Sequence, residues 1–308
     1  MWEKIGFYNV PKTPDWMHSH CQLPVALPID EHTVRVFFAA RSAQQRSHIG
    51  YVELVINGQG IDVIKVSEAP VLAPGPMGHF DQHGVFPSSI VFHNGLYYMY
   101  YIGWSQGVEA PLFDAAIGLA TSEDGVHFTR TSPAPLLGRS AYDPCLVTSP
   151  HVYKDGDLFR MTYVSGIKWE RGDDGILKSF YHIKQASGTS PYDCNRRGDV
   201  AIDFKDGETN IARSSVIKVS DDHYKMWYAY VHGTIGKYRI GYAESPDGST
   251  WTRMDDRAGI GLDDTHASEM ISYPHVFEMG DDLYMLYNGN QFGRDGFGVA
   301  KWQNDDQP

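Results

Sequence analysis

Four acidic side chains stand at nearly the same place ahead of four apolar, strand-like runs. Each lies five to seven residues before the Pro or Ser that opens its run; the acids are Asp81, Asp143, Glu208 and Glu269. Carboxylates gathered in a poorly solvated site do not all ionise, so one pKa rises while another stays low. Such a pair can act as general acid and as base or nucleophile, and cleavage of glycosidic bonds is the common reaction that needs it without a cofactor. Acids also cap turns ahead of strands, and that role fits each of the four taken alone. Because all four acids lie at nearly the same distance ahead of their runs, a shared functional site is favoured over four separate turn caps.

Histidines and aromatic residues accompany these acids in the connecting segments. Aromatic faces suit sugar rings, and a neutral imidazole offers one donor and one acceptor. The expected substrate-binding set is His18, His20, His79, His83, Trp104, Trp169, Arg213 and His266. Arg213 directly precedes the Ser that opens its run, where it either pins an anionic group or pairs with Glu208 or Glu269.

Two further histidines, His151 and His275, follow the Pro residues that open two of the runs. They either face the centre of the fold, as candidate ligands of water or a cation, or are satisfied core histidines. The spacing of His residues repeats no metal-ligand pattern beyond His18 and His20, so hydrogen bonding is favoured over metal binding. No Gly-rich motif opens a helix after a strand, so we expect no organic cofactor.

The elements that position these residues form a repeat of about 60 residues. The opening residues Pro24, Pro87, Pro150, Ser214 and Pro274 are 63, 63, 64 and 60 residues apart. An apolar run, a Gly/Asp turn, an alternating aromatic strand and a second hairpin follow each of them, and two hairpins carry a Ser-x-Asp-Gly turn. Four antiparallel strands per repeat describe the blade of a β-propeller. We therefore predict one all-β domain over residues 1–308, a five-bladed β-propeller with blades that start near residues 16, 80, 142, 207 and 268.

The segment at the start of the sequence can supply the strand that the last repeat lacks. Few residues follow the last apolar run, which ends at Trp302, while Trp2–Tyr8 precedes the first repeat. We predict that this N-terminal segment joins the last blade as its outer strand and so closes the ring and covers an edge. The segments that enter the first strands of a propeller open on one face, so the four acids are expected to converge on one mouth. A β-sandwich is the alternative, but the length of the repeat favours the propeller.

The net charge and composition of the chain limit which classes of partner are expected. The 308 residues carry a net charge of −12, which argues against nucleic acid or an anionic membrane surface as partner. No basic and apolar leader and no stretch of about 20 apolar residues occurs, so the expected location is the cytoplasm. The three cysteines, Cys21, Cys145 and Cys194, lie far apart and indicate neither a disulfide framework nor a zinc site. A small carbohydrate or a sugar conjugate is the expected substrate; the oligomeric state is left open.

Several motifs are similar to those of known propeller enzymes. The YDP step at Tyr142–Pro144, the SEDG and SPDG turns and the acid before each inner strand resemble the five-bladed glycosidases of glycoside hydrolase families 32, 43, 62, 68, 117 and 130. A closer resemblance, to a glycosidase-like group linked to bacterial surface-polysaccharide or sugar-biosynthesis genes, rests on FDQHGVFPSSIV, YYMYYIGW, YRIGYAESPDG, SEMISYPHV and YNGNQFGRDGFGVA.

This resemblance implies roles for the acids. Asp81 would be the base or nucleophile and Asp143 the orienting acid, while the general acid would be Glu208 or Glu269. The implied function is a glycoside hydrolase-like enzyme that cleaves or transfers a glycosidic bond. Relatives in family 130 use phosphate instead of water, and the His and Arg residues keep a glycoside phosphorylase or transglycosylase open. A non-catalytic sugar-binding propeller is the alternative from another functional class.

Overall fold

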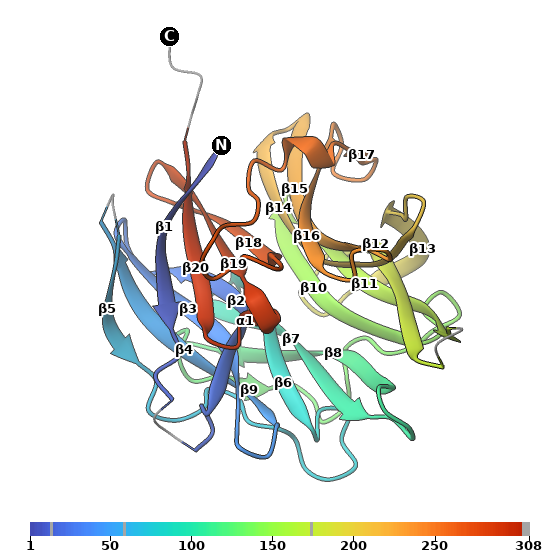
Figure 1. The fold of residues 1–308 in the computed structure, drawn as a ribbon. Helices are drawn as coiled ribbons and strands as arrows, with labels where there is room; N and C mark the ends of the chain where they lie inside the picture. The colour runs from blue at the N-terminus through green and yellow to red at the C-terminus, as the bar shows by residue number, and fades with distance from the viewer. Residues whose placement is uncertain (13–14, 58–59, 173–174, 304–308) are drawn as a thin grey trace.

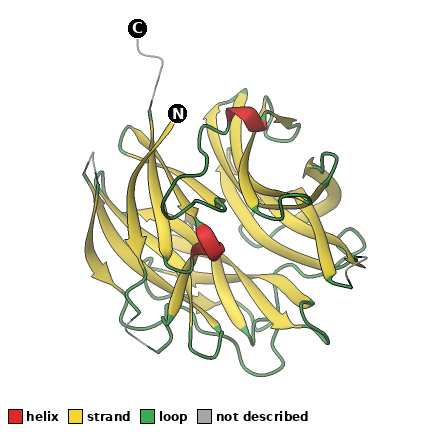
Figure 2. Cartoon of the chain, in the orientation of Figure 1, coloured by secondary structure: helices red, strands yellow, loops and turns green. Residues whose placement is uncertain are grey.

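The chain folds almost entirely into β-strands. The computed structural model describes residues 1–12, 15–57, 60–172 and 175–303, and the other positions of the predicted 1–308 domain lie outside the described residues. Two short helical segments interrupt the strands, the 3-10 turn η1 (Asp255–Arg257) and α1 (Asn290–Gly293) (Figure 2). The prediction of an all-β chain with very little helix is confirmed. No helix in the described ranges is long and apolar enough to cross a membrane.

The strands form five groups. The first four groups each consist of consecutive strands, and the fifth combines the last three strands with the N-terminal one. The first group contains β2 (Ser19–Pro28), β3 (Thr33–Arg41), β4 (Ser47–Ile56) and β5 (Ile61–Val66). The second contains β6 (Gly84–His93), β7 (Leu96–Gln106), β8 (Phe113–Ser122) and β9 (Thr129–Arg130). The third contains β10 (Leu146–Asp155), β11 (Leu158–Arg171), β12 (Leu177–Gly188) and β13 (Asn195–Ile202). The fourth contains β14 (Glu208–Ser220), β15 (His223–His232), β16 (Tyr238–Ser245) and β17 (Thr252–Arg253). The fifth contains β18 (Ser272–Met279), β19 (Asp282–Asn288), β20 (Gly296–Trp302) and β1 (Trp2–Asn9).

Hydrogen bonds join these groups into three sheets. The fifth group is a four-stranded sheet in the order β1-β20-β19-β18, in which β1 runs antiparallel to β20 (Figure 1). The first and second groups share one eight-stranded sheet, and the third and fourth share another. Within each eight-stranded sheet the two groups meet at a single parallel pair, Ser47 with Gly84 or Tyr181 with Asn210. The pairing of the N-terminal strand with the last group matches the sequence prediction.

The first strands of the five groups lie against one another. β2 contacts β6, β6 contacts β10, β10 contacts β14, β14 contacts β18, and β18 contacts β2. Each of these first strands has a register shift in its pairing with the second strand of the same group. The shift lies next to the Pro or Ser that opens the apolar run. Four residues at these shifts have positive φ: Leu23, Ser149, Arg213 and Tyr273. A bulge bends a strand and re-aims a side chain, so the shifts set which way the residues at this end of the strands point.

Alternation along the strands places neighbouring residues in different cores. Phe37 and Phe38 are consecutive in β3, and both are fully buried. The Phe37 ring lies 5.8 Å from that of Phe128 in the second group, whereas the Phe38 ring lies 6.2 Å from that of Phe297 in the fifth. Side chains at successive positions of a strand point to opposite faces, so one Phe-Phe step joins the first group to both of its neighbours.

The predicted Ser-x-Asp-Gly turns are present in the second and fourth groups. The Asp124 carboxylate accepts hydrogen bonds from the backbone N–H groups of Val126 and His127, both at 2.8 Å. Asp247 accepts the same two bonds from Ser249 and Thr250. The glycine of each turn has φ of +67°, a conformation that glycine adopts at little cost. These carboxylates therefore serve the fold.

Candidate functional site

Two of the predicted catalytic acids lie buried in ion pairs. Asp81 has no exposed surface; its Oδ2 accepts hydrogen bonds from Arg130 Nε at 2.8 Å and from the Tyr101 hydroxyl at 3.3 Å. Asp143 is equally buried and accepts from Arg196 Nη1 at 2.7 Å and from the Tyr163 hydroxyl at 3.2 Å.

Glu208 repeats the arrangement. Arg253 donates to both of its carboxylate oxygens, at 2.7 and 2.8 Å, and the Arg253 guanidinium lies 5.4 Å from the centre of the Tyr228 ring. In the second, third and fourth groups, an acid ahead of the first strand or at its first residue thus meets an Arg of the fourth strand beside a Tyr of the second strand. The fifth group has a variant, in which Lys4 of β1 pairs with Asp263 at 2.7 Å and lies over the Tyr287 ring. A recurring structural ion pair accounts for the shared phase of the three acids.

Glu269 lies elsewhere. It is exposed, and its carboxylate accepts a hydrogen bond from Lys237 Nζ at 3.0 Å. Its backbone N–H donates to the Asn290 side chain at 2.8 Å, which ties this segment to α1. None of Asp81, Asp143, Glu208 and Glu269 is among the described residues that line the large pocket of the molecule, although Lys237 is.

This large pocket has a volume of about 1150 Å³ and is called the mouth pocket here. Residues from all five groups and their connections line it, among them His20, Arg41, Phe113, Tyr181, Asn210, Tyr273 and Asp295. A second pocket of about 560 Å³ adjoins it, and the residues that line both are Gln22, Arg41, Gln45, Phe113, Tyr181, Tyr238 and Tyr273. The second pocket reaches the shifted ends of the first strands, at Leu23, Ser149 and Tyr273. Together the two pockets open over the strand ends that the bulges redirect.

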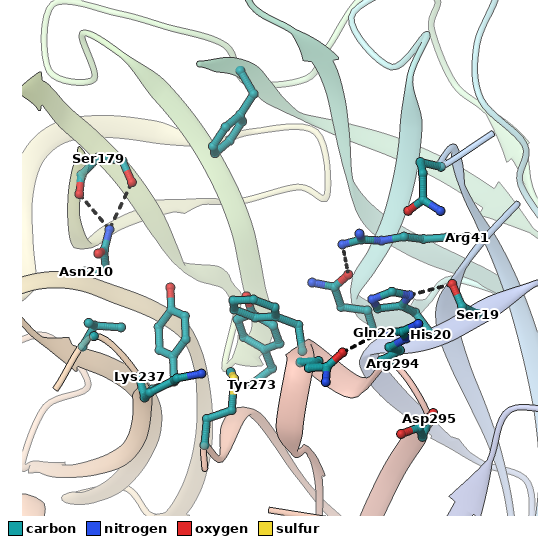
Figure 3. Close-up of a pocket in the computed structure, with 18 of the residues that line it drawn as sticks. Ser19, His20, Gln22, Arg41, Ser179, Asn210, Lys237, Tyr273, Arg294 and Asp295 are labelled. Atoms are coloured by element: carbon teal, nitrogen blue, oxygen red, sulfur yellow. Dashed lines mark hydrogen bonds between the residues drawn. The ribbon is translucent and has the colours of Figure 1, made fainter. Parts of the chain in front are cut away.

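One side of the mouth pocket is cationic. Arg41, His20 and Arg294 lie together there, with Asp295 beside them (Figure 3). Arg41 donates to the Gln22 side chain at 3.0 Å and Arg294 to the Gln291 side chain at 2.9 Å. Neither guanidinium pairs with a carboxylate of the described residues, and Asp295 is the only Asp or Glu among the described residues of the lining. In a chain of net charge −12, this is a local excess of positive charge.

His20 is uncharged at neutral pH. Burial is the main cause that lowers its pKa to about 4, and the positive charges of Arg41 and Arg294 lower it further. Its Nδ1 lies 2.8 Å from the Ser19 hydroxyl. A neutral imidazole in this place offers one donor and one acceptor beside two guanidinium groups.

Another side of the mouth pocket is aromatic. The Tyr238 and Tyr273 rings lie 5.5 Å apart, and the Phe292 ring is stacked on Tyr273 at 6.2 Å. The Tyr181 and Tyr238 hydroxyls are hydrogen-bonded to each other. Rings with polar tips bind the apolar faces of sugar rings while they donate and accept hydrogen bonds at the edge.

Two asparagines hold the segment that carries α1. Asn288, fully buried, accepts from the Leu23 N–H at 2.8 Å and donates to the Cys21 and Gly296 carbonyls at 2.9 and 3.2 Å. Asn290 accepts from the Glu269 and Met270 N–H groups. These bonds fix both ends of the loop that presents Arg294 and Asp295.

The predicted substrate-binding residues separate into those inside and those outside this site. His18 and His20 line the mouth pocket and Trp104 lines the adjoining one. The other predicted members are not among the described lining residues. Trp169 packs edge-on against the lining residue Phe113 at 5.6 Å, and His266 stacks on Phe7 at 3.6 Å. His79 is half-buried, and His83 lies 5.7 Å from the Trp104 ring.

Arg213 forms neither of the ion pairs that the sequence offers for it, with Glu208 or with Glu269. It is fully buried, donates to the Pro24 carbonyl at 3.1 Å and pairs with no carboxylate of the described residues. Glu208 is already bound to Arg253 and Glu269 to Lys237, so the expected pairing with either is wrong.

Burial lowers the pKa of the candidate cation ligands His151 and His275 below its usual range, and the nearby charge of Arg213 lowers it further. Among the described residues, no cluster of three or more His, Cys, Asp or Glu side chains is positioned for a metal. A positive neighbour disfavours a second cation.

The sequence reasoning missed Arg41, Tyr181, Asn210, Tyr238, Tyr273, Arg294 and Asp295. For Arg294 and Asp295 the signal is a break in the repeat: the connection GNQFGRD (residues 289–295) between β19 and β20 is longer than those between the second and third strands of the other groups. Asp295 lies between a second and a third strand, so it does not share the place of the four acids that precede the opening Pro or Ser residues.

Comparisons with known proteins agree with the fold. The chain is 35% identical over 307 residues to the uncharacterized protein MT1551 of Mycobacterium tuberculosis, with 98% of this chain and 99% of that protein covered. It is 22% identical to a 1,2-beta-oligomannan phosphorylase of Thermoanaerobacter sp. (strain X514), over 65% of this chain and 67% of the phosphorylase. Among solved structures, a thermostable family-43 glycoside hydrolase superposes with a TM-score of 0.67 at 18% identity, covering 93% of this chain and 91% of the hydrolase. No family model matches.

These similarities show a glycosidase-like fold of the family-43 kind, with distant similarity to oligomannan phosphorylases. The full-length match at 35% identity shows the nearer relationship, and the chain belongs to the same protein family as MT1551 of Mycobacterium tuberculosis.

Proposed function

We propose that the protein is a carbohydrate-active enzyme that cleaves or transfers a glycosidic bond in the mouth pocket. The observation that carries this proposal is the pairing of an aromatic wall, Tyr238, Tyr273 and Phe292, with a polar side that holds a lone carboxylate, Asp295. The aromatic wall binds the sugar rings, and the polar side faces the bond that reacts. The glycoside hydrolases and phosphorylases with which the chain shares its fold support this class of reaction.

We place the reacting carboxylate at Asp295. It is exposed to the pocket and makes no side-chain hydrogen bond or ion pair with the described residues. Asp81, Asp143 and Glu208 are held by arginines outside the lining, so proton transfer to a substrate in the pocket is not available to them in this conformation. Glu269, at the rim beside Lys237, is the predicted acid that a small loop movement would bring nearest.

Phosphorolysis is the second candidate, favoured by the cationic side of the pocket. Hydrolysis by two carboxylates needs both within about 5–10 Å across the bond. Only one carboxylate is among the described lining residues, whereas Arg41 and Arg294 carry uncompensated charge. In phosphorolysis, phosphate attacks the anomeric carbon while an acid protonates the leaving oxygen, so one carboxylate and an anion site suffice.

The scaffold proposed for this reaction is a five-bladed propeller in which each group of strands is one blade and β1 completes the fifth. The cyclic contacts of the first strands and the pairing of β1 with β20 support it. A cytoplasmic location, a requirement for no cofactor and a sugar or sugar-conjugate substrate without nucleic-acid or membrane partners complete the proposal.

The test is a screen of aryl glycosides and oligosaccharides, β-1,2-mannosides included, with and without inorganic phosphate. Wild type, Asp295→Asn, Glu269→Gln and Asp81→Asn are compared. We expect turnover in the wild type, its loss in Asp295→Asn, and turnover by the folded fraction of Asp81→Asn. Activity that needs phosphate identifies phosphorolysis. Full activity of Asp295→Asn overturns the placement of the acid, and failure of the wild type to turn over or bind any member of the screen overturns the proposed class.

A further inference from the structure

The centre of the fold contains a buried positive charge without a counter-ion among the described residues. Arg213 has no exposed surface and lies at the register shift of β14, where its φ is +45°. Among the described residues, eight other arginines pair with carboxylates within 4 Å: Arg35, Arg130, Arg139, Arg160, Arg171, Arg196, Arg253 and Arg257. All eight are less buried than Arg213, which has no such partner although it is fully buried.

Its guanidinium is only partly bonded. One Nη donates to the Pro24 carbonyl at 3.1 Å, while Nε and the other Nη have no hydrogen-bond partner. Burial lowers the pKa of Arg213 to about 9, which leaves the group protonated at neutral pH. A buried charge with unmet donors costs far more than a paired one.

The neighbours of Arg213 carry no negative charge at neutral pH. His151 and His275 face it from β10 and β18, with their ring centres 6.4 Å apart. The Nε2 of His151 lies 3.2 Å from the Val216 carbonyl and so donates to it, and a ring N–H of His275 bonds the Ala26 carbonyl. Both Nδ1 atoms are left without a partner and, in the neutral rings, accept hydrogen bonds.

We propose that the guanidinium of Arg213 binds a small inorganic monovalent anion, such as chloride, between the first strands of the fold. The anion would accept from Nε–H and the unpartnered Nη–H and would balance the charge. Water bound to the anion can donate to the Nδ1 atoms of His151 and His275. The Arg213 charge disfavours a cation in the same place, and water alone would satisfy the donors but not the charge.

The ligand is small because the site is closed. Arg213, His151 and His275 are not among the described lining residues of the mouth pocket or of the adjoining pocket. A sugar or an organic acid in the mouth therefore does not reach the guanidinium. The anion site is separate from the proposed catalytic site, and its test does not depend on turnover.

The experiment compares thermal unfolding in sodium chloride and in sodium gluconate at equal ionic strength. The variants are wild type, Arg213→Met and Arg46→Met, the last of which removes an exposed Arg that has no ion pair among the described residues. Chloride at about tenfold above its Kd should raise Tm by about 3 °C in wild type and in Arg46→Met. The difference between the two salts should vanish in Arg213→Met.

A second measurement covers the case in which Arg213→Met does not fold. Wild-type crystals soaked in sodium bromide should show an anomalous peak within hydrogen-bonding distance of the Arg213 guanidinium. Equal Tm values in the two salts, or bromide-soaked crystals without a peak at Arg213, overturn the proposal.

Discussion

The interior of the strand groups and the mouth pocket use the same residue types in opposite ways. Inside the groups, Asp81 and Glu208 are each neutralised by an Arg of the fourth strand. In the mouth pocket, Arg41 and Asp295 line the same cavity without an ion pair to any described residue. Paired charges at a repeated phase hold a fold together, whereas unpaired charges that face a cavity are available to a ligand. Recurrence within the repeat therefore fits a structural role for these acids, and departure from the repeat marks the proposed site.

The largest effect is expected from breaking one interior pair. Arg130→Met leaves Asp81, which has no exposed surface, without its ionic partner. Because removal of one member of a buried pair strands the other charge, the free energy of unfolding should fall by about 3–5 kcal/mol, measured by denaturant titration. The exposed substitution Arg46→Met is the control and should change stability by less than about 0.5 kcal/mol.

A double variant tests whether the loss of stability comes from the unpaired Asp81 charge. Asp81→Asn added to Arg130→Met removes the stranded charge, so part of the lost stability should return. Equal losses in Arg130→Met and in Arg46→Met would show that the pair contributes nothing, and the contrast between interior and mouth would fail.

The next effect is expected at the mouth. Asp295→Asn removes the proposed general acid without disturbing an ion pair, so turnover should fall by about 10²-fold or more, as is typical of general acid catalysis. Stability should stay within about 0.5 kcal/mol of wild type because the side chain is exposed. Steady-state kinetics and denaturant titration on the same preparation measure both. A loss of stability comparable to that of Arg130→Met would place Asp295 with the structural acids.

A smaller effect concerns pH. The pKa of His20 is lowered to about 4, below the ordinary 6.5, so the unfolded chain binds a proton that the folded chain refuses between these values. Stability should therefore fall as the pH drops from 6.5 towards 4, and His20 should account for about 1–2 kcal/mol of the fall at pH 5.

The check is the free energy of unfolding of wild type and His20→Gln at pH 7 and pH 5. Because His151 and His275 also have lowered pKa values, both proteins lose stability on acidification, but His20→Gln should lose less. Identical losses would contradict a buried, neutral His20.

The smallest effect is expected from Arg41→Met. One charged hydrogen-bond donor is lost from the cationic side of the mouth, so the affinity for inorganic phosphate or for an anionic sugar should fall about tenfold. Titration calorimetry with phosphate measures this affinity, and Lys154→Met, which removes an exposed charge outside the described pocket lining, is the matched loss of charge. Equal phosphate affinity in the two variants would remove the support for phosphorolysis.

The sequence was sufficient to predict strands, turns and repeat, because these depend on local patterns. Pro24, Pro87 and Pro150 set the period, and Asp124 and Asp247 form the turns that their spacing predicts. The role of Asp81 could not be predicted in this way, because Arg130 lies 49 residues further along the chain. A partial signal existed: Thr-Arg ends the second hairpin in both the second and fourth groups, at Arg130 and Arg253.

The mouth pocket was harder to predict because no local pattern marks most of the residues that line it. Arg41 ends β3, Tyr273 lies in β18 and Asp295 follows α1, and only the assembled fold brings them together. The predicted lining residues His18 and His20 were found because they stand in the same kind of connecting segment as the acids. His79 and Trp169 satisfy the same rule but lie outside the described lining.

The bulges at the ends of the first strands have a consequence for how the protein can change. Leu23, Ser149, Arg213 and Tyr273 occupy equivalent places with positive φ, where a residue other than glycine costs about 1–3 kcal/mol. Glycine would relieve that cost at each place, yet it would delete an apolar, a hydroxyl, a cationic or a phenolic group. At each of these four equivalent positions, the substitution that would stabilise the backbone would also remove the side-chain group. The backbone at these positions already accommodates four different side chains. Substitutions there are therefore a route by which relatives with this fold could acquire different ligands.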